Sequence, residues 1–249
     1  MNKIQQEEAL SQDYMLSLIP DSRKQLVKLS QDNVARIEAM ISNDSGYLKG
    51  RDKNNKPSKK SNGSTAFWMC ELKKVLLGDD SSEYQYRTIV AEAVCAVDRE
   101  NTTHLNADGV GREQITDRIC NIPQDKLIEY LKFPDETNLE LIEIIAQKTM
   151  PIENGKKSRC NPSFASKFCH YAAFYLFENT EYQDNFSIYD NVLKNVIPLY
   201  AKYYGIEYEN LDDYRNYRNV VDGIITKSGG HISRNGFDHL LWYYHKGRL

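Results

Sequence analysis

Apolar residues recur at spacings of three and four positions along nearly the whole chain of 249 residues. Within residues 22–42, for example, they fall at Val27, Val34, Ile37 and Ile41, which is the stripe of an α-helix. No convincing alternation with a period of two occurs, so we expect no sheet. The fold class is therefore predicted to be all-α.

Clusters of Gly, Ser, Asn, Pro and Lys divide this pattern into segments, as such residues do between helices. Residues 42–65 lack periodicity and are predicted to be an exposed loop, with six basic residues and one acid between positions 49 and 60. A second Gly/Lys/Arg-rich connection opens the region 151–249, after an N-terminal helical region 1–150; the two form separate subdomains or one integrated domain. The predicted helices are 4–18, 22–42, 65–78, 82–98, 111–119, 123–132, 136–149, 163–178, 187–204, 209–226 and 235–246.

Composition excludes several classes of protein. No stretch approaches the roughly 18 consecutive apolar residues of a membrane span, and the acid-containing N-terminus lacks a signal core. A net charge of −3 argues against a general polyanion-coating protein, although a local basic face stays compatible with it. Five widely spaced cysteines without a CxxC pair indicate reduced thiols and no metal centre. We therefore expect a cytoplasmic protein, without membrane, metal or cofactor.

A lysine stands in an unusual place within NPSFASKFCHYAAFYLF, residues 161–177. Lys167 borders a helix face that contains Phe164 and Phe168. A lysine on a helix usually stays solvated, with its stem on apolar surface. An amine held against aromatic rings instead loses hydration, so its pKa is expected to fall, and a neutral lysine can form a Schiff base. Asp190 follows 23 positions later, inside the apolar run FSIYDNV.

Residues 155–200, with SRCNPSFASKFCHYAAFYLF and FSIYDNVLKNVIPLY, resemble the core of the helix–hairpin–helix DNA glycosylases. This is the superfamily of 8-oxoguanine DNA glycosylase and endonuclease III. In that family a lysine opens the second helix of the motif, and an aspartate follows in a short apolar segment. Lys167 and Asp190 match these two positions. The resemblance implies a glycosylase-like fold of two packed helical subdomains with a helix–hairpin–helix-like motif.

The same resemblance implies a bifunctional reaction on duplex DNA with a flipped base. Lys167 would attack C1′ of the extruded nucleotide, Asp190 would stabilise the positive charge on the sugar, and a Schiff base would permit strand cleavage. Aromatic residues suit stacking against a flipped base. Candidates for the pocket or for orienting groups are His170, Phe164, Trp242, Tyr243 and His239. His170 has the alternative of a core residue, and the C-terminal helix that carries the last three has the alternative of closing the core.

Basic side chains are the predicted contacts to the DNA backbone. Where the family has a glycine-rich hairpin, this chain reads KKSRCNPS, so Lys156, Lys157 and Arg159 would contact phosphates by side chain. From the basic loop we expect Lys49, Arg51, Lys59 and Lys60 to add contacts that weaken steeply with salt.

Two further interpretations compete with the glycosylase. The first is a non-catalytic nucleic-acid-binding module of the same fold, in which Lys167 and Asp190 form a buried ion pair. The second is an all-helical interaction protein without a role on nucleic acid. A likeness to bacterial proteins of this fold found beside mobile elements and phage defence genes supports the fold more than any substrate. A monomer is expected in each case.

Overall fold

Helices dominate the computed structural model of the protein, which confirms the all-α class. Ten α-helices, one 3-10 helix and one pair of two-residue strands occur in the residues that the structure describes. Within those residues, no helix combines the length and the apolar character that a membrane crossing requires. The structure describes residues 16–17, 25–43, 63–78, 84–105, 111–150, 158–229 and 231–245.

The chain forms two compact units, the first from residues 1–48 and 189–249 and the second from residues 49–188. This division differs from the expected boundary between residues 150 and 151. The reason is packing. The helix at 162–176 contacts helices that precede residue 150. The helices at 191–204, 214–227 and 234–245 instead pack with the helix at 31–43 or with each other.

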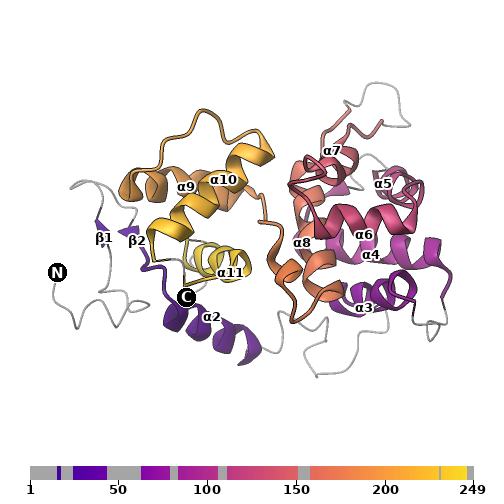
Figure 1. The fold of residues 1–249 in the computed structure, drawn as a ribbon, viewed down its shortest axis with the longest axis horizontal. Helices are drawn as coiled ribbons and strands as arrows, with labels where there is room; N and C mark the ends of the chain where they lie inside the picture. The colour runs from indigo at the N-terminus through magenta and orange to yellow at the C-terminus, as the bar shows by residue number, and fades with distance from the viewer. Residues whose placement is uncertain are drawn as a thin grey trace. The chain divides into compact units, whose positions relative to one another are not determined.

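In the part of the chain that the structure describes, unit 1 comprises four helices and the short strand pair (Figure 1). Helix α11 packs on both α2 and α9, and α10 packs on α9. Strand β1 (Leu16–Ser17) pairs antiparallel with β2 (Gln25–Leu26). The helices are α2 (Gln31–Asn43), α9 (Asn191–Tyr204), α10 (Tyr214–Lys227) and α11 (Arg234–His245).

Unit 2 is built around α8, which contacts α3, α4, α6, α7 and the 3-10 helix η2. Figure 1 shows α8 in orange beside these helices. The elements of this unit are α3 (Thr65–Leu76), α4 (Tyr86–Asn101), α5 (Gly111–Cys120), α6 (Gln124–Lys132), α7 (Glu140–Ala146), α8 (Pro162–Leu176) and η2 (Glu181–Asp184).

Most predicted helices overlap these elements, although their bounds differ in several places. Helix α4, predicted at 82–98, runs from Tyr86 to Asn101. Residues 16–17 and 25–26 lie in strands rather than in the predicted helices 4–18 and 22–42, because a nonlocal backbone pairing replaces helical bonding there. The helix predicted at 136–149 begins only at Glu140, since Asn138 and Leu139 adopt positive φ. Helices α9 and α10 start at 191 and 214, immediately after aspartate caps. Most of the expected basic loop at 42–65 lies outside the described residues.

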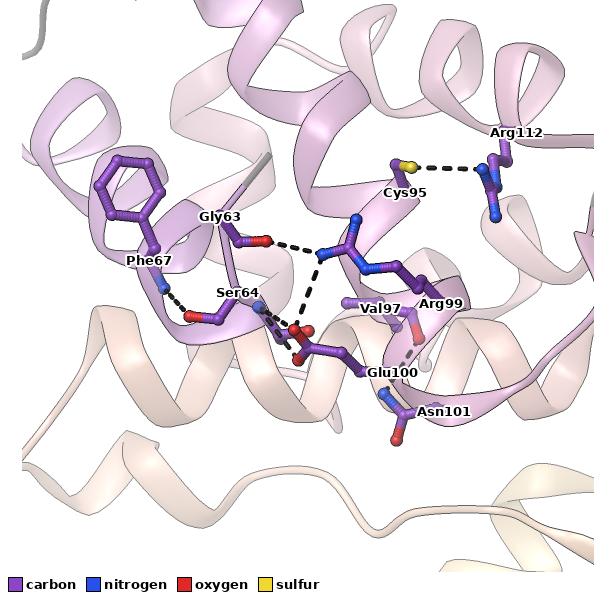
Figure 2. Close-up of polar contacts among 10 residues, drawn as sticks. Gly63, Ser64, Phe67, Cys95, Val97, Arg99, Glu100, Asn101 and Arg112 are labelled. Atoms are coloured by element: carbon purple, nitrogen blue, oxygen red, sulfur yellow. Dashed lines mark hydrogen bonds and ion pairs between the residues drawn. The ribbon is translucent and has the colours of Figure 1, made fainter. Parts of the chain in front are cut away.

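The last turn of α4 makes hydrogen bonds to two other elements of unit 2, and Figure 2 shows those to the start of α3. Arg99 Nη2 donates to the Gly63 carbonyl at 2.6 Å, and the Glu100 carboxylate accepts from the Thr65 backbone N–H. Both contacts hold the start of α3. Asn101 accepts a hydrogen bond from the Tyr171 hydroxyl of α8 at 3.1 Å. One helix end therefore orients α3 against α8.

Candidate active site

Helix α8 starts at a fixed point because its N-cap, Asn161, is anchored to the end of α7. Asn161 N donates to the Ala146 carbonyl at 3.0 Å, and Asn161 Nδ2 donates to the Arg159 carbonyl at 3.1 Å. Thr149 and Arg159 form an antiparallel bridge across the connection. Pro162 occupies the first helical turn, where its fixed φ suits a helix and its missing N–H has no cost.

The middle of α8 is enclosed on all sides. Every residue from Phe164 to His170 is buried, and this run includes Lys167, whose exposed fraction is 7%. A helix that is buried all round belongs to the core, which explains why α8 touches so many neighbours. The solvated-lysine interpretation is therefore wrong. An amine taken out of water is costly, so a buried lysine on such a helix requires an explanation beyond packing.

His170 and Phe164 have structural surroundings on this helix. His170 Nδ1 lies 2.8 Å from the Phe186 carbonyl, and because a carbonyl only accepts, Nδ1 carries the hydrogen and donates. The imidazole also stacks on Phe174, with ring centroids 6.1 Å apart. Phe164 is buried and stacks on Phe168. Both residues contribute to the core of unit 2, and His170 fixes the segment that leads towards Asp190.

Asp190 is the N-cap of α9. Its Oδ1 accepts hydrogen bonds from the backbone N–H groups of Val192 at 2.8 Å and Leu193 at 3.0 Å, which satisfies donors that a helix start leaves open. The side chain is 8% exposed. The aspartate thus has a defined local orientation, and capping gives it a structural role independent of catalysis.

A second buried carboxylate, Asp238 on α11, lies near the same part of unit 1. Tyr217 of α10 is fully buried, and burial raises its pKa well above the usual value; the carboxylates of Asp238 and Asp190 raise it further. Both acids therefore lie within electrostatic range of one tyrosine hydroxyl. Asp238 was not among the residues predicted from the sequence, although an acid within the apolar run FDHLL is a usable signal.

Helix α11 is docked at its C-terminal end by a buried hydroxyl. The Tyr200 hydroxyl accepts from Val27 N at 3.1 Å and lies 2.9 Å from His245 Nε2. Near the other end, Gly236 sits so close to α2 that an added Cβ would lie 2.9 Å from Val34 Cγ1. These contacts support the interpretation of α11 as a helix that closes the core of unit 1.

The three pocket candidates on α11 are all half-buried. Trp242 and Tyr243 meet edge to face, with ring centroids 4.9 Å apart, and His239 lies one turn earlier. Their role as walls of a base pocket stays a prediction.

Of the predicted phosphate contacts, Arg159 is exposed at the connection into α8. The others, Lys49, Arg51, Lys59, Lys60, Lys156 and Lys157, lie outside the described residues.

Lys167 belongs to unit 2 and Asp190 to unit 1, so their pairing also stays a prediction. No cluster of His, Cys, Asp and Glu suited to a metal ion occurs among the described residues. All five cysteines are free thiols. Comparisons with family models, with curated proteins and with solved structures found no match to this chain.

Proposed function

We propose that the protein is a DNA glycosylase with lyase activity that excises a damaged or modified base. The observation that carries the proposal is the burial of Lys167 in the middle of an aromatic helix. A lysine amine can attack carbon and form a Schiff base, and its enclosed position sets Lys167 apart from the solvated lysines of a surface helix. The match of Lys167 and Asp190 to the glycosylase pattern supplies the substrate class.

In the proposed reaction Lys167 Nζ attacks C1′ of a flipped nucleotide. The bond from C1′ to the base breaks, and the base leaves with the electron pair and takes up a proton. Loss of a proton from the nitrogen and opening of the C1′–O4′ bond, with O4′ protonated, give the imine. Removal of a C2′ proton then expels the 3′ phosphate, and hydrolysis of the imine releases the enzyme.

Asp190 has the proposed role of stabilising positive charge on the sugar while the base departs. Its cap bonds hold the carboxylate in one orientation, as a preorganised electrostatic group requires. Helices α7 and α8, which pack together, are the proposed counterpart of the helix–hairpin–helix motif. Arg159, exposed before α8, would contact a phosphate of the bound strand.

The cap role of Asp190 also favours a second candidate, a nucleic-acid-binding protein of the same fold without catalysis. In that protein Asp190 would serve α9 alone, and Lys167 would be a structural cation. Substitutions separate the two candidates. Asn caps a helix about as well as Asp, so Asp190→Asn removes the charge and keeps the cap.

A screen of duplexes with damaged and modified bases tests the proposal, with base release and strand nicking as readouts. We expect activity on at least one duplex, lost by about a hundredfold or more in Lys167→Met and Asp190→Asn. The matched controls are Lys202→Met, an exposed lysine on α9, and Asp213→Asn, the cap of α10. Binding without release on every duplex would favour the non-catalytic candidate.

A further inference from the structure

A cavity of about 440 Å³ lies beside the first turn of α3, within unit 2. Its volume falls in the range of small-molecule sites, about 300–1,000 Å³. Three of its walls are aromatic: Phe67 and Tyr84 are each 42% exposed, and Trp68 is 5% exposed. The described lining residues are Gly63, Phe67, Trp68, Tyr84, Thr88 and Glu92.

The three rings are set at steep angles to one another. Phe67 meets Trp68 edge to face at 5.0 Å between centroids and 82° between planes. Trp68 meets Tyr84 at 5.1 Å and 69°. Because their planes are steeply inclined, the three rings line the cavity from different directions, as the walls of a box do. They do not form one flat stacking surface.

Gly63 keeps this box open. It adopts φ +83, and a Cβ built there would lie 2.7 Å from the Phe67 ring and 2.8 Å from Trp68 Nε1. Any side chain would therefore press on two of the three rings, in a backbone conformation that favours glycine.

The glycine and the start of α3 are held in place by the contacts drawn in Figure 2. Ser64 Oγ caps the helix by accepting from Phe67 N at 3.1 Å. Arg99 holds the Gly63 carbonyl, and its guanidinium lies 3.8 Å from Glu100. The two aromatic walls on α3, Phe67 and Trp68, thus stand on a helix start that is capped and hydrogen-bonded to α4.

Glu92 gives the box its charge. Among the described residues that line the cavity, Glu92 carries the single formal charge, and it is an acid. Aromatic faces are negative and attract cations, and rings that enclose quaternary ammonium groups are the established use of this attraction. A carboxylate in the same lining repels phosphates and adds to the attraction for a cation.

We propose that this box binds a quaternary or methylated ammonium group. None of its residues belongs to the proposed glycosylase site, so the inference goes beyond the proposed function. The ammonium group can be carried by a small free molecule or by a methylated lysine of another protein. The chemistry recognised is the same in both, and the two sources are separated by the probes used.

Fluorescence of Trp68 measures the binding. The chain has two tryptophans, so the Trp242→Phe background leaves Trp68 as the single indole reporter. The full chain in this background is titrated with choline and with 3,3-dimethyl-1-butanol, its neutral isostere, at constant ionic strength. A peptide with one trimethyllysine and its unmodified counterpart form the second arm.

We expect saturable quenching by choline or by the trimethyllysine peptide, at least about tenfold tighter than by the neutral or unmodified partner. Glu92→Gln should weaken it about fivefold or more, whereas Glu143→Gln, an exposed acid on α7, leaves it unchanged. Tighter binding of the peptide identifies a protein-borne ligand, and tighter binding of choline a free one. Equal binding of charged and neutral probes, or no saturation by either cation up to about 10 mM, overturns the proposal.

Discussion

Replacement of Asp98 on α4 should destabilise unit 2 more than replacement of a residue in a surface ion pair. The exposed fraction of Asp98 is 3%. Its Oδ1 accepts from Thr103 Oγ1 at 2.6 Å and from Leu105 N at 3.0 Å. Its Oδ2 accepts from Arg112 Nε at 2.8 Å and from Nη2 at 2.7 Å. One carboxylate therefore closes the turn after α4 and attaches α5 to it.

The magnitude follows from which of these bonds a substitution removes. Asp98→Asn keeps an oxygen for Thr103 and Leu105 but loses the paired bonds from Arg112, which we expect to cost about 1.5–3 kcal/mol. Asp98→Ala loses all four bonds and leaves the Leu105 N–H without its acceptor, so we expect it to lower the free energy of unfolding by about 3–5 kcal/mol. Because the Arg112 side chain is 33% exposed, water screens the lost charge, and the lower end of each range is expected.

The same carboxylate predicts a pH dependence. Burial would raise the pKa of Asp98, but the hydrogen bonds from Thr103, Leu105 N and Arg112 outweigh it and lower the pKa below its usual value. Its contribution to stability is present above the unfolded value of about 3.9 and is lost as the pH falls through the lower folded value. The difference between wild type and Asp98→Asn should therefore be constant near neutrality and shrink below about pH 4.

Urea unfolding followed by circular dichroism measures both effects, and Asp117→Asn is the matched control. Asp117 on α5 pairs with Arg87 on α4, so the same two helices are joined, but both side chains are about half exposed. Such a surface pair should be worth less than about 1 kcal/mol. If Asp98→Ala cost no more than Asp117→Asn, the reasoning from burial and hydrogen bonding would be refuted.

Three further predictions concern the two cores. Gly236→Ala should cost about 1–3 kcal/mol in thermal unfolding, because the added methyl group meets Val34 in a tight helix contact; an unchanged melting temperature would contradict that packing. Burial raises the pKa of the Cys169 thiol, so iodoacetamide at pH 8 should label it only in denaturant, as peptide mass spectrometry can show; labelling in the native protein would exclude the buried position. Tyr200→Phe should cost about 1–3 kcal/mol in urea unfolding, because Val27 N loses its buried acceptor, and a cost below about 0.5 kcal/mol would show that this bond is replaced.

Sequence periodicity predicted the helices that bury one apolar stripe, as α3 and α6 do. It did not predict β1 and β2, or the late start of α7, because these depend on nonlocal pairing and on left-handed residues such as Leu139. The sequence also could not predict the division into units, since this division depends on which helices α8 and α11 contact in space.

For the candidate site, the sequence could predict the burial of Lys167, because its neighbours along the helix are aromatic or small. It could not predict that Asp238 is buried near the hydroxyl of Tyr217, since the two residues lie on different helices. The aromatic box was missed for the same reason: Gly63, Tyr84 and Glu92 meet only after α3 packs on α4.

Borohydride trapping on a duplex with one abasic site tests whether Lys167 forms a Schiff base with DNA, and it needs no knowledge of the excised base. Reduction of the imine would leave a covalent protein–DNA adduct, and proteolysis with mass spectrometry would locate the modified residue. We expect an adduct at Lys167 that is lost in Lys167→Met and kept in Lys202→Met. An adduct that survives Lys167→Met, or no adduct with a protein that binds the duplex, would contradict it.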